Sequence, residues 1–291
     1  MKKKTLFLTG AIAAGTSVAA LYKAIGDYTK KMLYRNEIER TELSDEFETV
    51  RLKNEKGLVL YGYLKEKEGA KRTLIMMHRL GENASYLVED MEQFEKLLPD
   101  ANILLLDAAA HGTSDGYMRG FGYRDADDLE AWINEMIKRF GEDHTFVLYG
   151  AGMGANTALN AAGLGKLKNV SCIVSDGAYD SVASYIGAKV FKKFKVNSKL
   201  SHIVMSRVFQ NETGMNIDDM DTVRLVRNNT IPTIFMHSKE DTDVPFREVF
   251  ELYNHNEGRS VLFPIKEEHF YDMNQEDDYS QILAEFLKEN A

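Results

Sequence analysis

The sequence predicts an α/β fold, with a mostly parallel sheet of eight strands that is flanked by helices and interrupted by one helical insertion. Short apolar runs of strand length alternate with helix-length segments, which implies crossover connections between parallel strands. The runs are nearly continuously apolar, as expected for strands covered on both faces. A length of 291 residues and a hydrophobic fraction of 44% fit one large globular domain.

The expected strands begin with a hairpin and then follow one another at helix-length intervals. They span residues 47–52, 58–64, 73–77, 103–106, 146–149, 171–174, 231–236 and 260–263. The expected helices span residues 84–97, 125–139, 153–164 and 281–288. The turn residues Asn54-Glu55-Lys56-Gly57 between the first two strands are typical of a hairpin.

Residues 181–229 contain no clean strand, and we expect them to form a helical cap over the carboxyl edge of the sheet. Five lysines lie there among aromatic residues: Lys189, Lys192, Lys193, Lys195 and Lys199. Such a cluster is typical of a solvated helix face. The alternative is a patch that faces anionic lipid or an acidic partner.

Residues 1–40 are interpreted as a membrane anchor or signal segment followed by a helical stem, and residues 41–291 as the α/β domain. Three lysines precede an uncharged run at residues 5–22, whose length lies between that of a signal-peptide core and a membrane span. We expect a single N-terminal anchor in the cell membrane, with the soluble domain outside the cytoplasm. The alternatives are secretion after cleavage and a buried amphipathic helix.

Charge and cysteine content exclude several classes of function. The net charge is −9, and the first 35 residues are basic, so the remainder is strongly acidic and argues against nucleic acid as a partner. The single cysteine, Cys172, rules out an intrachain disulfide, and its apolar surroundings indicate a buried thiol. Zinc-type spacing and nucleotide-binding glycine patterns are absent from the sequence, so we expect no metal and no cofactor.

The segment Val-Leu-Tyr-Gly-Ala-Gly-Met-Gly at residues 147–154 is the most informative in the chain. It reads as a buried strand, a sharp turn and a helix, which is the setting of the G-x-S-x-G nucleophile elbow. Gly150 and Gly154 supply the small residues that the turn needs. Gly152 stands where the motif has serine, so the elbow has no oxygen with which to attack a carbonyl.

Four further segments follow the order of known landmarks. They are Met-His-Arg-Leu-Gly at 77–81, Asp-Ala-Ala-Ala-His-Gly-Thr-Ser at 107–114, His-Ser-Lys-Glu-Asp at 237–241, and the loop that carries His269. With the elbow, they resemble the α/β-hydrolase superfamily, and within it the bacterial serine hydrolases of the esterase, lipase or aminopeptidase type. The resemblance extends from about residue 46 to the C-terminus.

The resemblance implies a catalytic triad at the elbow. Gly152 holds the nucleophile position, Asp241 is the acid that orients the histidine, and His269 is the general base. Asp176 lies at the other place where this fold carries an acid. The backbone N–H groups of Leu80 and Met153 are the implied oxyanion donors.

Several positions depart from the family pattern together with the elbow. Arg79 and Ser238 replace glycines, and Ala109 and Ala110 replace Arg-Gly. Arginine at a position of positive φ would strain or reshape the oxyanion loop. In the family the second segment is structural, so we expect its Asp107, His111 and Ser114 to make local contacts.

The joint departures favour a degenerate hydrolase scaffold, catalytically impaired, that binds a ligand or acts in regulation at the membrane. The expected ligand is a small acyl or ester compound, or a peptide. One alternative is an enzyme without serine, in which His269 activates a water molecule beside Gly152. Another is an inactivated form of an active hydrolase of esters or peptides.

Overall fold

The computed structural model describes residues 2–35, 39–196, 198–265 and 277–291, without the side chains of residues 2–17, 198 and 277–280. In this part of the chain, eight strands form one sheet in the order β1-β2-β4-β3-β5-β6-β7-β8. The strands are β1 (Glu48–Lys53), β2 (Val59–Lys65), β3 (Arg72–Met77), β4 (Ala101–Asp107), β5 (Thr145–Ala151), β6 (Val170–Asp176), β7 (Thr233–Ser238) and β8 (Ser260–Ile265). β2 is antiparallel to both neighbours, and all other pairs are parallel. The predicted fold is thereby confirmed.

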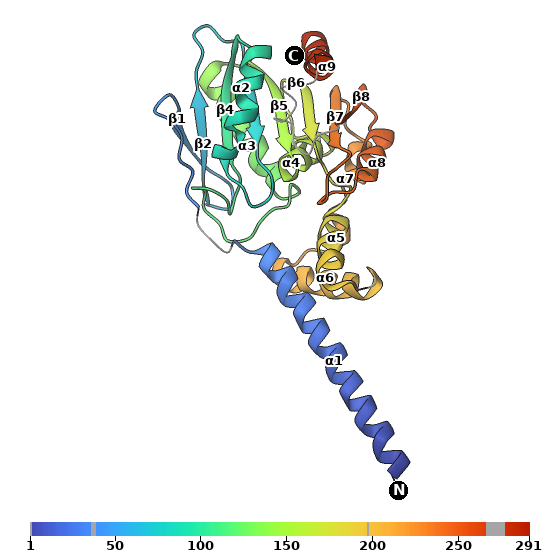
Figure 1. Ribbon diagram of the computed structural model, residues 1–291. Coiled ribbons are helices and arrows are strands. Elements are labelled where there is room, and N and C mark those ends of the chain that lie inside the picture. The colour runs from blue at the N-terminus through green and yellow to red at the C-terminus, as the bar shows by residue number, and fades with distance from the viewer. Residues whose placement is uncertain (1, 36–38, 197, 266–276) are drawn as a thin grey trace.

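Helices cover both faces of the sheet and enclose a hydrophobic core on each (Figure 1). On one face pack α3 (Asp125–Phe140), α4 (Met153–Gly163) and α8 (Arg247–His255). On the other face pack α2 (Val88–Leu97), which follows the short helix η1 (Ala84–Leu87), and α9 (Asp277–Asn290). Because side chains alternate along each strand, Leu148 points into the first core and its neighbour Tyr149 into the second.

The stretch between β6 and β7 is helical, as the sequence predicts. It contains α5 (Val182–Phe194), α6 (Ser198–Thr213), the short helix η2 (Ile217–Asp219) and α7 (Thr222–Val226). Ser181 caps α5 by accepting a hydrogen bond from the N–H of Ser184, and Asp221 caps α7 in the same way.

Helix α1 (Lys2–Leu33) belongs to the folded domain over its second half. Ile25 and Leu33 are fully buried and share a third core with α5 and α6. The Arg35 guanidinium donates to the carbonyls of Gly112 and Ser114, so the end of the helix is tied to the loop after β4. The stem expected from the sequence is thus helical, and its apolar side packs against the cap.

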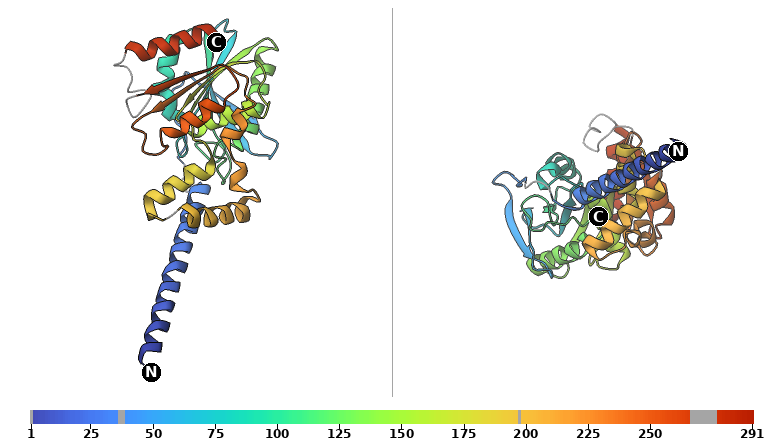
Figure 2. Two further views of the ribbon diagram at one scale, coloured as in Figure 1. Left: turned by 90° about the vertical axis from the view of Figure 1, so that its right-hand side faces the viewer. Right: turned by 90° about the horizontal axis from the view of Figure 1, so that it is seen from below.

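The first half of α1 extends away from the sheet, past α5 and α6 (Figures 1 and 2). In the part of the chain described, no helix combines the length and the apolar character needed to cross a bilayer. Membrane attachment of the N-terminal segment therefore stays a prediction.

Candidate functional site

The elbow at the end of β5 has the geometry that the sequence predicts. Gly152 adopts φ 52° and ψ −112° between the last residue of β5 and the first of α4. A Cβ at Gly150 would lie 2.3 Å from the Gly154 carbonyl carbon, and a Cβ at Gly154 would lie 2.2 Å from the Met77 carbonyl oxygen. Only glycine fits at both places, because strand and helix approach one another too closely for a side chain.

Arg79 crosses the space above Gly152. A Cβ at Gly152 would lie 3.2 Å from Arg79 Cγ and 3.6 Å from its Cβ. The arginine Nη2 donates to Asp176 Oδ2 over 2.7 Å, and the Asp176 side chain is only 5% exposed whereas that of Arg79 is 28% exposed. The aliphatic part of the Arg79 side chain, whose guanidinium is held by Asp176, thus covers the position from which a nucleophile would act.

Arg79 does not strain the loop that carries it. The described residues other than glycine with positive φ do not include Arg79, so the strain considered from the sequence is not found at this position. Gly81 and Ala110 have positive φ instead, 89° and 62° respectively. Ala110 stands where the family pattern has glycine, and a left-handed alanine costs about 1 kcal/mol or more.

A cavity of about 180 Å³ lies beside Gly152 and Arg79. Its walls come from the ends of β3, β5, β6 and β7 and from the cap, and they include Arg79, Leu80, Gly152, Met153, Asp176, Tyr185 and Asp241. All the described site residues expected from the sequence therefore meet in one place. His269 lies outside the described residues, so its pairing with Asp241 stays a prediction.

Asp241 is held rigidly by its own loop. Its Oδ1 accepts hydrogen bonds from the N–H groups of Asp243 at 2.7 Å and Val244 at 2.9 Å. Its Oδ2 lies 3.5 Å from Nε2 of the buried His237, and that nitrogen also lies 3.0 Å from the Val244 carbonyl oxygen. This carboxylate is fixed in position at the cavity wall, as an orienting acid must be.

Two residues that line the cavity have backbone N–H groups without a hydrogen-bond acceptor in the described part of the chain. Among the hydrogen bonds of the described residues, the N–H groups of Leu80 and Met153 donate to no partner. The neighbouring N–H groups are occupied, since Gly152 donates to the Asp176 carbonyl and Gly154 to the His78 carbonyl. Met153 is the first residue of α4, where the helix dipole favours negative charge. The donors that the resemblance implies are thus available to bind a carbonyl oxygen.

A buried carboxyl near Arg79 is not among the site residues predicted from the sequence. Asp90 on α2 accepts a 2.9 Å hydrogen bond from the Tyr149 hydroxyl, and its Oδ1 has no partner in the described part of the chain. Burial, and secondarily the charge of Asp176, raise the pKa of Asp90 to about 7. Burial alone would lower the pKa of Arg79, but neighbouring carboxylates, Asp176 foremost, raise it above its usual value. The only sequence signal was a polar residue on the apolar face of a helix.

The loop after β4 is structural, as expected. Asp107 accepts hydrogen bonds from the N–H groups of Ala84 and Thr113, and the Ser114 hydroxyl donates to the Asp107 carbonyl. Ser114 thus makes the local contact that the sequence predicts. Cys172 is a free, buried thiol, and burial raises its pKa to about 12. The described residues contain no group of three or more His, Cys, Asp or Glu side chains placed to hold a metal ion.

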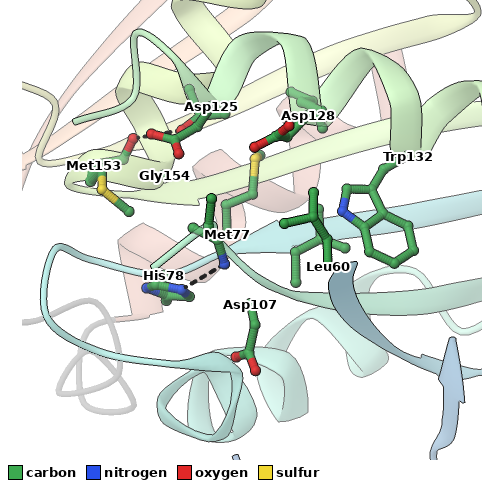
Figure 3. A pocket seen from close by; sticks show the side chains of 14 residues that line it. Leu60, Met77, His78, Asp107, Asp125, Asp128, Trp132, Met153 and Gly154 are labelled. Carbon is green, nitrogen blue, oxygen red and sulfur yellow. Dashed lines mark hydrogen bonds between the residues drawn. The ribbon is translucent and has the colours of Figure 1, made fainter. Parts of the chain in front are cut away.

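A smaller cavity of about 30 Å³ lies behind the elbow (Figure 3). Asp125, Asp128 and Trp132 line it from α3, and Met77 and His78 line it from the end of β3. Burial raises the pKa of Asp125 to about 7, although its carboxylate accepts a hydrogen bond from the Gly122 N–H. This volume holds only about one or two water molecules. A ligand of acyl or peptide size does not fit in this smaller cavity.

The fold and the elbow together define this chain as a protein with the α/β-hydrolase fold. Solved structures with this fold include the Pyrococcus furiosus esterase Pf2001, at TM-score 0.71 and 21% identity over 88% of this chain and 99% of that one. The Exiguobacterium antarcticum esterase EaEST matches at TM-score 0.58 and 20% identity, over 83% of this chain and 100% of that one. At such identities the likeness shows the fold alone.

Comparison of sequences adds one relative. The uncharacterized protein YqkD of Bacillus subtilis is 21% identical over 207 residues, which cover 71% of this chain and 67% of YqkD. No family model matches the chain.

Proposed function

We propose that this chain is a ligand-binding protein on an α/β-hydrolase scaffold and that it forms no acyl-enzyme. The observation that carries the proposal is the position of Arg79, whose arm lies 3.2 Å from where a side chain at Gly152 would begin. Loss of the serine and gain of the arginine fit one another sterically, and the Arg79–Asp176 pair holds the arrangement. This steric fit supports a site in which positions 79 and 152 have changed together, rather than an active hydrolase inactivated at one residue.

The ligand carries a carbonyl or acyl group and is a small acyl or ester compound or a peptide. The N–H groups of Leu80 and Met153 are suited to bind a carbonyl oxygen, and the N-terminus of α4 strengthens that binding. Tyr185, on α5 of the cap, supplies an aromatic wall. The esterase activity in the names of the structural neighbours is consistent with a ligand of this class.

We place the chain at the cell membrane, held by the N-terminal segment, with the α/β domain outside the cytoplasm. Support comes from the uncharged run at residues 5–22 after three lysines. Secretion after cleavage of this segment is the alternative. An N-terminal sequence determined on the protein isolated from its host separates the two.

A second candidate function is slow hydrolysis by a water molecule that His269 activates. The rigid Asp241 carboxylate favours it, because an orienting acid is still in place. Hydrolases that lose a triad member keep a residual rate on the order of 10³ to 10⁴ over water.

Hydrolysis of p-nitrophenyl acyl esters distinguishes the two functions. We expect the native chain, Asp241→Asn and His269→Ala to show the same background rate, because in a ligand-binding protein neither Asp241 nor His269 takes part in hydrolysis. A rate in the native chain that falls in both variants would establish water activation instead. Calorimetric titration with the non-hydrolysable acyl amide of the same chain length tests binding, which the proposal expects and which the absence of heat would contradict.

A further inference from the structure

The tip of the α5–α6 hairpin exposes two large apolar side chains. Phe191 near the end of α5 is 56% exposed, and Ile203 in the first turns of α6 is 58% exposed. Both line an open groove of about 800 Å³ whose floor contains the small residues Ala183, Gly187 and Ala188. Solvent-facing apolar residues grouped around a groove are typical of an interaction surface.

The same hairpin carries a strong positive charge. Residues 182–213 contain six basic residues and one acidic residue, Glu212, in a chain whose net charge is −9. Glu212 is bound by Lys30 of α1, and Lys189 is turned inward to Asp243 at 2.5 Å. Lys192 is exposed beside Phe191, although its Nζ lies 3.6 Å from Asp243 Oδ1, and Lys195 is exposed as well. The solvated helix face expected from the sequence is therefore wrong for Lys189, whereas the exposure of Lys192 and Lys195 fits both that face and the lipid-facing alternative.

Contacts with α1 fix the direction in which this tip faces. The Tyr28 and Phe194 rings meet edge to face at 5.6 Å, and Lys193 Nζ lies 4.2 Å from the centre of the Tyr28 ring. The first half of α1 continues past α5 and α6, away from the sheet, in both views (Figures 1 and 2). The first half of α1 is half of a 32-residue helix, so it extends about 24 Å, which is less than the hydrocarbon core of a bilayer at about 30 Å.

We propose that Phe191, Lys192, Lys195 and Ile203 form a tip surface that docks on an anionic phospholipid bilayer. Apolar side chains among lysines are the signature of a segment that lies in the membrane interface. The lysines are attracted by anionic headgroups, whereas the acidic remainder of the chain is repelled. A bilayer that surrounds the first half of α1 meets this surface, so the inference rests on the proposed membrane attachment.

The docking joins the membrane to the candidate site through one helix. Tyr185 lies at the cavity beside Gly152, and Phe191 lies less than two turns further along α5. The cap would therefore be held between lipid and ligand site.

A fluorescent label on the full-length chain tests the docking. Ile203→Cys is labelled with an environment-sensitive dye, and Cys172 remains unlabelled because it is buried and burial raises the pKa of its thiol to about 12. The control is a label at Leu164→Cys, an exposed position at the end of α4. Both proteins are reconstituted in vesicles of phosphatidylcholine with or without phosphatidylglycerol, and nitroxide lipids serve as quenchers.

We expect the label at position 203 to shift to the blue and to be quenched only in phosphatidylglycerol vesicles. The effect should disappear in 1 M salt, where the screening length falls to about 3 Å. The variant Lys192→Glu/Lys195→Glu should reduce the quenching of the label at position 203 at least about tenfold. The matched variant Lys67→Glu/Lys71→Glu, at exposed lysines before β3, should leave this quenching unchanged.

Two results would overturn the inference and are distinguishable. A label that stays in water while the chain sediments with vesicles refutes the docking alone. A chain that sediments with no vesicle refutes membrane attachment and the docking with it. Neither result bears on ligand binding beside Gly152, which is measured separately by titration.

Discussion

Restoring the serine at position 152 should not by itself restore a reactive nucleophile. The backbone there has φ 52°, a conformation that costs a side-chain-bearing residue about 1–3 kcal/mol. The new Cβ would lie 3.2 Å from Arg79 Cγ, so the arginine arm must move by a few tenths of an ångström. The arm is anchored by its bond to Asp176, and it continues to cover the serine.

We therefore expect Gly152→Ser to fold, to lose about 1–3 kcal/mol of unfolding free energy, and to resist a fluorescent fluorophosphonate. Adding Arg79→Gly uncovers the serine, and labelling should then appear, with Asp241 and His269 as the retained acid and base. Gly152→Ala/Arg79→Gly is the control, because it has the same strain without the hydroxyl. Equal labelling of Gly152→Ser with and without Arg79 would refute the role of the arginine, and circular dichroism verifies folding in each case.

Three further predictions concern stability. Arg79→Ala removes the ion pair to the buried Asp176 carboxylate and should lower the unfolding free energy by about 2–3 kcal/mol, at or below the lower end for a broken buried pair because Arg79 is partly exposed. An unchanged urea midpoint would contradict this. Because the pKa of Asp90 is raised to about 7, the folded state favours its protonated form, and stability should fall as the pH rises from about 4 to about 7. Asp90→Asn should remove that part of the pH dependence and be the more stable protein above pH 7, whereas parallel pH profiles would argue against a neutral buried carboxyl. Ile25→Ala should cost about 2–4 kcal/mol and expose the hairpin to protease, while Val18→Ala, at an exposed position, should change neither.

The sheet and the elbow could be predicted because local sequence determines them. Apolar runs at helix-length spacing specify parallel strands, and Gly150 and Gly154 specify a turn in which strand and helix nearly touch. The approximate place of Asp241 followed from the order of the motifs. These features depend on residue type and spacing, which a sequence displays directly.

The Arg79–Asp176 pair could not be predicted in the same way. The sequence showed that arginine replaces glycine, but its partner is 97 positions away, and the two loops meet only because β3, β5 and β6 are neighbours in the sheet. The pairing of Asp90 with Tyr149 depends on the same tertiary packing. For α1, the spacing of apolar residues predicted a helix with an apolar stripe but did not identify α5 and α6 as the elements that bury it.

We infer that no atom of this site accepts an acyl or phosphonyl group. Intact-mass spectrometry of the native chain after prolonged incubation with a fluorophosphonate tests it most directly. We expect a mass equal to that of the untreated chain. A stoichiometric mass increase, with the adduct mapped by fragmentation to a residue lining the cavity beside Gly152, would contradict it.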